Sequence, residues 1–303
     1  GGSLGQAAWP SGAGTQTLHA LGQGVADHAT LADQARRTQR ENQRTDFPQT
    51  TATDSPLTML GLKELADIAS EHSDALAAKV APVNLTDSLT VADGQPTFMG
   101  VVNLSPDSWY RESVCLTVDS AVQRGCVLAE QGAAIVDIGA ESTLGQADRV
   151  DAAAQQQRLI PVIEQLSTAG VVVSAETYDL EVAKACLAAG AKVLNLTGSA
   201  QSGEMYRLAA DHDAAVIVCY VAGENVREVQ DIPIDDDPIP RMSDFFEREI
   251  EMATGCGLRK GFVDPGLGFY YKNLQDSSVR IRHQMKTFLN AFRLRTLGWP
   301  VCN

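Results

Sequence analysis

Polar side chains suited to acid, amide or anion-binding chemistry recur in four short segments of the 303-residue chain. The segments read NLSPDS at 103–108, DIGAEST at 137–143, SAET at 174–177 and DPGLGF at 264–269. Each follows an apolar, β-prone run, which predicts a strand that ends in a polar loop. Asn195 ends a fifth apolar run in the same way. Acids and amides that converge on one face make a poor core and a good binding site.

The second and fourth segments each suggest a specific local chemistry. Ser142 and Thr143 follow a strand, where their hydroxyls and the backbone amides could hold an anion. Asp264 precedes a tight glycine turn, which places its carboxylate at the beginning of a sharp bend. Taken alone, each segment is more often structural than functional. Their combination at successive strand ends is what indicates a site.

Apolar runs and helical stretches alternate regularly along most of the chain. The runs lie at 98–102, 134–138, 171–174, 193–196, 215–219 and 261–263, and a seventh begins at Trp299. The helical stretches lie at 117–131, 152–168, 180–189, 205–211 and 242–254. This alternation predicts right-handed βαβ units and a parallel sheet. Polar residues at the carboxyl ends of many strands, without a GxGxxG or GxxxxGK[ST] loop, favour a (β/α)8 TIM barrel of the α/β class.

Two domains are expected. Residues 1–95 form an N-terminal extension, which we predict to be partly flexible, with an amphipathic helix near 57–80. Residues 96–303 form the barrel domain.

Composition excludes several classes of partner and site. The net charge of −14 argues against nucleic acid or an anionic membrane as the main partner. No apolar run approaches the roughly 20 residues that a membrane-spanning helix needs. Six scattered cysteines without a CxxC pair predict reduced, mostly buried thiols in a cytoplasmic protein. Five histidines without an HxH or HxxxH pair argue against a histidine-rich metal centre.

The motifs, in this order, resemble those of dihydropteroate synthases, a family within the wider pterin-binding barrels. The resemblance rests on NLSPDS, DIGAEST, SAET followed by EVA, LN at the fourth strand, and DPGLGF, and it covers about residues 96–303. It implies a transferase of folate biosynthesis. Such an enzyme joins 6-hydroxymethyl-7,8-dihydropterin diphosphate to p-aminobenzoate and releases diphosphate.

The resemblance also implies roles for seven residues. The pterin would meet Glu176, Asn195 and Asp264, because acceptor carboxylates suit a guanidine-like donor edge and an amide serves donors and acceptors alike. Asn103 would bind a Mg²⁺ ion that neutralises the leaving diphosphate. Asp107, Ser142 and Thr143 would help to order the site over that diphosphate. The implied catalytic residues are Asn103, Asp107 and Asp264.

Several positions depart from the family pattern. Glu176 stands where the family usually has Asp, and Leu144-Gly145 stands where Arg-Pro-Gly usually follows Ser-Thr. The residues 109–112 replace a Ser-Asp-Gly-Gly-like turn, and Tyr220-Val221 replaces a His-Met pair. The family's last basic motifs would lie beyond Asn303, so the barrel is expected to be C-terminally incomplete.

Three functional readings stay open at this point. The first is the synthase reaction. The second is a non-catalytic pterin-binding paralogue, which Leu144, Glu176 and the missing basic motifs favour. The third is a methyltetrahydrofolate-dependent methyltransferase, against which NLSPDS and DIGAEST weigh. Many barrels of this kind dimerise through their outer helices, so a homodimer is also possible.

Overall fold

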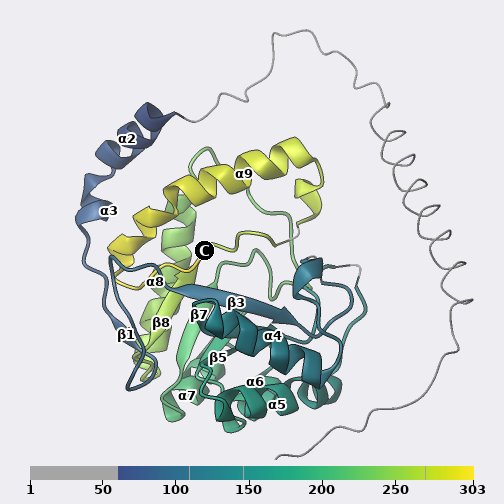
Figure 1. Cartoon of the computed structure of the whole chain (residues 1–303). Helices are drawn as coiled ribbons and strands as arrows, with labels where there is room; N and C mark the ends of the chain where they lie inside the picture. Colours follow the sequence, from purple (N-terminus) through teal and green to yellow (C-terminus); the bar gives the residue numbers. More distant parts are fainter. Residues whose placement is uncertain (1–60, 109, 146, 270) are drawn as a thin grey trace, which may run out of the picture. The chain divides into compact units, whose positions relative to one another are not determined.

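A six-stranded parallel sheet positions the polar residues predicted at the strand ends. The computed structural model describes residues 61–108, 110–145, 147–269 and 271–303. The strands pair in sequence order, β3-β4-β5-β6-β7-β8, and the sheet curls into a half-barrel with helices around it (Figure 1). Their bounds are β3 Phe98–Asn103, β4 Ala133–Gly139, β5 Val173–Thr177, β6 Val193–Leu196, β7 Ala215–Cys219 and β8 Gly261–Asp264. The predicted α/β barrel class is confirmed.

The predicted strands match the observed strands closely, with one clear shift. The run predicted at 171–174 is the strand β5 at Val173–Thr177, because the strand continues through Glu176 instead of ending before it. The expected seventh run is present as a parallel bridge between Val263 and Val301. The Val263 amide donates to the Pro300 carbonyl at 3.0 Å, and the Cys302 amide donates to the Val263 carbonyl at 2.8 Å.

Helices follow the strands, and those packed around the sheet belong to one large core cluster with its outer face. The helices are α4 Val118–Glu130, α5 Ala152–Thr168, α6 Leu180–Ala188, α7 Ser202–Asp211, α8 Ile239–Gly255 and α9 Ser277–Asn290, of which α9 packs against the 3₁₀ segments near the end of the chain. Aspartates cap three of them: Asp151, Asp179 and Asp276 accept hydrogen bonds from the first-turn amides of α5, α6 and α9. Three short 3₁₀ segments lie between these elements or after them: η1 Arg111–Ser113 before α4, η2 Lys272–Leu274 before α9, and η3 Ala291–Leu297 after α9.

Helix α9 was not predicted from the sequence. Three of its apolar residues, Ile281, Met285 and Phe288, are 53%, 44% and 56% exposed, whereas its buried residues are His283 and Thr287. The helix therefore lacks the usual correspondence between an apolar stripe and the buried face on which sequence prediction depends.

The period of two along each strand divides the sheet into two faces. Val136, Ile138, Val173 and Ala175 belong to the large cluster shared with the helices, so they point outward. Ile135, Val193, Ile217 and Phe262 form a second cluster on the inner face. The same register places on that inner face a set of polar residues nearer the carboxyl ends: Asn103, Asp137, Ser174, Glu176, Asn195, Cys219 and Asp264. The inner face is thus apolar at its base and polar at its mouth.

The part of the N-terminal extension before residue 61 lies outside the described residues. The helix expected near 57–80 is two helices, α2 Leu62–Glu71 and α3 Ser73–Ala77, which are separated at His72. Arg295 of η3 ends α3, because its guanidinium donates to the carbonyls of Ala75 and Ala78 at 3.2 and 3.0 Å. A short antiparallel pair, β1 Val83–Asn84 and β2 Thr90–Val91, precedes the sheet.

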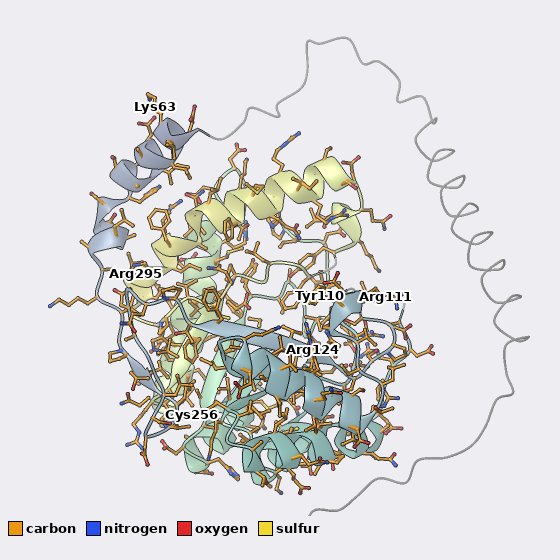
Figure 2. All side chains as sticks on the ribbon, viewed as in Figure 1. Lys63, Tyr110, Arg111, Arg124, Cys256 and Arg295 are labelled. Carbon is orange, nitrogen blue, oxygen red and sulfur yellow. The ribbon has the colours of Figure 1, made fainter. Side chains whose placement is uncertain are left out.

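The two ends of the sheet differ in character. Val83 and Leu85 pack against the inner cluster at the base, where Arg295 also lies (Figure 2). Tyr110 and Arg111 lie beyond the opposite, carboxyl end of β3 (Figure 2). None of the helices in the described ranges is long and apolar enough to cross a membrane.

Candidate active site

Asp137 on β4 is the hub of the polar mouth. Its Oδ1 accepts a hydrogen bond from the Ser174 hydroxyl at 2.6 Å, and its Oδ2 accepts one from the Asn195 amide at 3.1 Å. The Asn195 Oδ1 in turn accepts from the Cys219 thiol at 3.3 Å. Four successive strands are thereby connected through side chains on the inner face. This network fixes the Asn195 amide with its nitrogen toward Asp137.

Glu176 on β5 extends across the sheet toward β4 and β3. A Cβ placed on Gly139 would lie 2.5 Å from the Glu176 Oε2 and 3.4 Å from the Asn103 Oδ1. The carboxylate therefore occupies the space that the missing side chain of Gly139 leaves open, beside the Asn103 amide. The extra methylene of Glu allows this reach, and a larger residue at 139 would displace it.

Asp264 ends β8 on the same face. Its Oδ1 accepts a hydrogen bond from the Gly266 amide at 2.7 Å, which fixes the carboxylate at the beginning of the glycine turn. The backbone of Gly266 has φ +75°, and a Cβ there would lie 2.2 Å from the Tyr220 carbonyl oxygen. The turn thus requires glycine for both its conformation and its close approach to the end of β7.

The loop after β3 contacts the loop after β4. The Asn103 Nδ2 donates to the Ser113 hydroxyl at 2.7 Å, and this leaves its Oδ1 turned toward the mouth. The Ser142 hydroxyl donates to the Asp107 carbonyl at 2.9 Å, so the two loops predicted to cover an anion are joined. Arg111, in the loop after β3, is exposed and donates to the Pro106 carbonyl at 2.6 Å.

A second hydrogen-bonded chain runs along the rim. Tyr178 donates to Glu141 at 2.5 Å, and the Arg149 guanidinium donates to the Tyr178 oxygen at 3.0 Å and to Glu228 at 3.1 Å. The other Glu141 oxygen accepts from the Val150 amide at 3.0 Å. The loops after β4, β5 and β7 are therefore held together around the mouth.

The three acids of the inner face share one electrostatic environment. Burial raises the pKa of Asp137 to about 6, although the hydrogen bonds from Ser174 and Asn195 act in the opposite direction. Burial also raises the pKa of Asp264 to about 6, with the Gly266 amide opposing it and the Asp137 charge adding to it. The pKa of Glu176 rises to about 8, because burial and the nearby charges of Asp137 and Glu141 act in the same direction. Glu176 is thus the acid that stays protonated at neutral pH.

This raised pKa predicts a pH-dependent stability. Glu176 is expected to have its ordinary value of 4.5 in the unfolded chain and about 8 in the folded chain, so the folded state binds more protons between these values. Stability is therefore lost as pH rises through that window. Glu176→Gln should raise the free energy of unfolding at about pH 8.5 by roughly 1–3 kcal/mol and change it little at about pH 4.5. Partial exposure of the side chain keeps the effect below the full linkage value.

Urea unfolding of both proteins at the two pH values measures this difference. Glu164→Gln on the exposed face of α5 is the matched control, and it should shift stability equally at both pH values. An equal effect of Glu176→Gln at both pH values would contradict the assigned protonation.

The structure brings four of the seven expected site residues, Asn103, Glu176, Asn195 and Asp264, to one inner face. Ser142 and Asp107 meet through the loop contact, whereas Thr143 is a partly buried neighbour in the same loop. The expected set omitted Asp137, Tyr178 and Arg227. Asp137 is the first residue of the DIGAEST motif, and its position near the end of a strand could have identified it as a site residue. Tyr178 and Arg227 gave no such signal, because their hydrogen-bond partners are far away in sequence.

The cysteine prediction is partly wrong. All six thiols are free, but only Cys186 and Cys219 are buried, and Cys115, Cys126, Cys256 and Cys302 are partly exposed.

A parallel half-barrel with acids and amides at its carboxyl mouth is the arrangement of a pterin-binding enzyme, and residues 99–301 match the family model described as "Pterin binding enzyme". The chain is 32% identical over 215 residues to dihydropteroate synthase of Streptococcus pyogenes, across 70% of this chain and 75% of that one. The chain belongs to the dihydropteroate synthase family.

Solved structures support the same assignment. Xanthomonas albilineans dihydropteroate synthase with 4-aminobenzoic acid is similar with a TM-score of 0.60 and 29% identity, covering 74% of this chain and 77% of that one. The same organism's enzyme in complex with 7,8-dihydropteroate is similar with a TM-score of 0.56 and 28% identity, covering 73% and 76%.

Proposed function

We propose that the protein condenses 6-hydroxymethyl-7,8-dihydropterin diphosphate with p-aminobenzoate, as a transferase of folate biosynthesis. The observation that carries this proposal is the set of inner-face acids and amides at the mouth of a barrel of this family. Relatives that bind 4-aminobenzoic acid and 7,8-dihydropteroate supply the chemical class of substrate and product. The proposal includes a cytoplasmic location, which six free thiols favour, and leaves open a homodimer.

Asp264 and Asn195 are proposed to hold the pterin. An ionised Asp264 accepts hydrogen bonds from the amino and ring N–H groups, and its position is fixed by the Gly266 amide. Asn195 is oriented by Asp137 and Cys219, so the amide enters the site without free rotation. Glu176, protonated and lying over Gly139, offers a neutral acid that can donate as well as accept.

Asn103 is proposed to hold Mg²⁺ through its amide oxygen, a ligand type that suits this ion. The donation of its nitrogen to Ser113 leaves that oxygen available, so the residue fits the role. The described residues contain no group of three or more His, Cys, Asp or Glu side chains placed to hold a metal, so phosphate and water oxygens would complete the shell. When bound, the ion would neutralise charge on the leaving diphosphate.

Asp107, Ser142 and Thr143 are proposed to order the loops over the diphosphate. The bond between the pterin methylene carbon and the diphosphate oxygen breaks, a carbon–nitrogen bond to p-aminobenzoate forms, and the amine loses one proton to the departing diphosphate or to solvent. Positive charge develops at the methylene carbon as diphosphate departs. The nearby carboxylates of Asp137 and Asp264 stabilise this charge because they are already fixed in a partly dry site.

A non-catalytic pterin-binding protein is the second candidate. It is favoured by Leu144, which stands where the family usually has arginine, and by Glu176, whose carboxylate lies against Gly139. Such a protein would keep the pterin contacts and lose the diphosphate chemistry.

Titration of the purified protein with the dihydropterin diphosphate, with and without Mg²⁺ and p-aminobenzoate, distinguishes these candidates. The synthase predicts pterin binding and release of diphosphate that depends on p-aminobenzoate. Binding without release would favour the second candidate. Absence of any pterin binding would overturn both.

A further inference from the structure

Arg227 lies in the connection between β7 and α8 and reaches into the loop after β4. Its side chain is 9% exposed, so the guanidinium is buried. One terminal nitrogen donates to the carbonyls of Ser142 and Leu144, the latter at 2.6 Å, and the other donates to the Ala147 carbonyl at 2.5 Å. A single side chain therefore holds three carbonyls of the loop at residues 142–147.

Arg227 itself is held in place from its own backbone. Its amide donates to the Asn225 side chain at 2.9 Å, and the neighbouring Val226 amide donates to the Thr197 carbonyl at 2.9 Å. Asn225 and Val226 are also buried. The backbone segment of Arg227 is thus hydrogen-bonded to the residue that follows β6, and this fixes the position from which its side chain binds the loop.

The positive charge of Arg227 is not neutralised by a side chain. It forms no ion pair with any residue of the described ranges, and its Nε is buried without a hydrogen-bond partner. A buried, uncompensated cation is costly unless something in the functional state uses its field. The loop that it holds begins at Ser142, whose hydroxyl contacts the loop of Asp107.

Arg227 brings a positive charge to the loop in which Leu144 stands where the family usually has arginine. The loop after β4 has no arginine or lysine between Ser142 and Ala147, although Ser142 and Thr143 are placed to meet an anion. Arg227 reaches the same loop from the connection between β7 and α8. Its guanidinium binds backbone carbonyls of the loop, so these contacts do not depend on the side chain at residue 144.

We propose that Arg227 is a positioning residue that orders the loop at 142–147 and supplies the positive field for the diphosphate of the substrate. This inference rests on the proposed function and names the group that replaces the loop's own cation. Because the terminal nitrogens are occupied by carbonyls and Nε is covered, Arg227 acts through the loop and does not touch the ligand. A guanidinium suits this role, since its planar fork can donate in several directions at once, which an ammonium on a flexible stem cannot reproduce.

The test compares two ligands, dihydropterin diphosphate and 6-hydroxymethyl-7,8-dihydropterin without diphosphate, bound to the full chain and to Arg227→Met. We expect the variant to lose about 10- to 100-fold in affinity for the diphosphate ligand, because a displaced loop costs this much in a positioned site. Affinity for the ligand without diphosphate should stay within about threefold, since Asp264 and Asn195 lie on other elements. In turnover, KM for the diphosphate substrate should rise more than kcat falls.

Arg227→Lys is the second variant, and it keeps the charge but cannot hold three carbonyls. It should recover part of the diphosphate affinity, while hydrogen exchange at 142–147 stays faster than in the unchanged protein. If Arg227→Met is too unstable to titrate, the hydrogen exchange of Arg227→Lys at 142–147 still tests whether Arg227 orders the loop. Arg241→Met is the matched control, because Arg241 is an exposed arginine that pairs with Asp235 and has no bond to this loop.

Equal losses for both ligands, or no loss for either, would overturn the inference. So would a loss in Arg241→Met as large as that in Arg227→Met. If the unchanged protein binds neither pterin, the proposed function fails. If the unchanged protein binds both ligands and Arg227→Met has the same ratio of affinities for them, only the proposed role of Arg227 fails.

Discussion

Asp264→Ala should abolish pterin binding, with an affinity loss of at least about 100-fold. Asp264 is the proposed acceptor for the pterin N–H groups, and its carboxylate is fixed by the Gly266 amide on the inner face of β8. Removal of the acid leaves those donors without a partner, and a lost hydrogen bond to a charged group costs more than one between neutral groups. Equilibrium titration with a dihydropterin, followed by fluorescence or calorimetry, measures the loss.

Asp264→Asn separates the charge from the shape of this residue. It should keep the fold and still bind the pterin at least about tenfold more weakly, because an amide presents only one acceptor oxygen. Asp244→Ala, on the exposed side of α8, is the control and should leave affinity unchanged. Unchanged affinity in Asp264→Ala would show that the pterin pocket lies elsewhere in the barrel.

Gly266→Ala should destabilise the protein by about 2–5 kcal/mol and weaken pterin binding with it. The residue has φ +75°, which side chains disfavour, and a Cβ would lie 2.2 Å from the Tyr220 carbonyl oxygen. That oxygen belongs to backbone and cannot move aside as a flexible side chain would. The amide that positions the Asp264 carboxylate would shift as well. Urea unfolding gives the stability change, and pterin titration gives the functional one.

Gly268 provides a matched control within the same turn. It also has a positive φ, +91°, but a Cβ there meets nothing within 4 Å. Gly268→Ala should therefore cost only the conformational strain, about 1 kcal/mol. If the two alanine variants were equally stable, the contact with Tyr220 would not be what restricts position 266.

The apolar runs of this chain were sufficient to predict its sheet, because strands buried on both faces leave a strong local signal. β6 Val193–Leu196 and β7 Ala215–Cys219 agree with the predicted runs to the residue. The point where each run ends then places Asn103, Glu176, Asn195 and Asp264 at strand ends, and a parallel sheet brings those ends together. The family resemblance adds the ligand class to a site that the pattern had already located.

Elements with an unusual distribution of exposure were harder to predict. α9 buries His283 and Thr287 and exposes Ile281, Met285 and Phe288, so much of its local pattern contradicts its environment. The helix expected near 57–80 is divided at His72, and the Arg295 guanidinium that ends its second half comes from more than 200 residues away. No window of neighbouring residues contains that contact.

The barrel class, the strand ends and the acids and amides gathered there could be predicted from local patterns, because hydrophobic period and residue type are properties of short segments. The contacts of those groups became apparent only in the folded chain. Folding placed Glu176 over Gly139, made Asp137 the hub of the network, and brought Arg227 under the loop at 142–147. Side-chain contacts between loops 35 to 85 residues apart depend on how strands curl and which loop each one faces. That information exists only once the chain has folded.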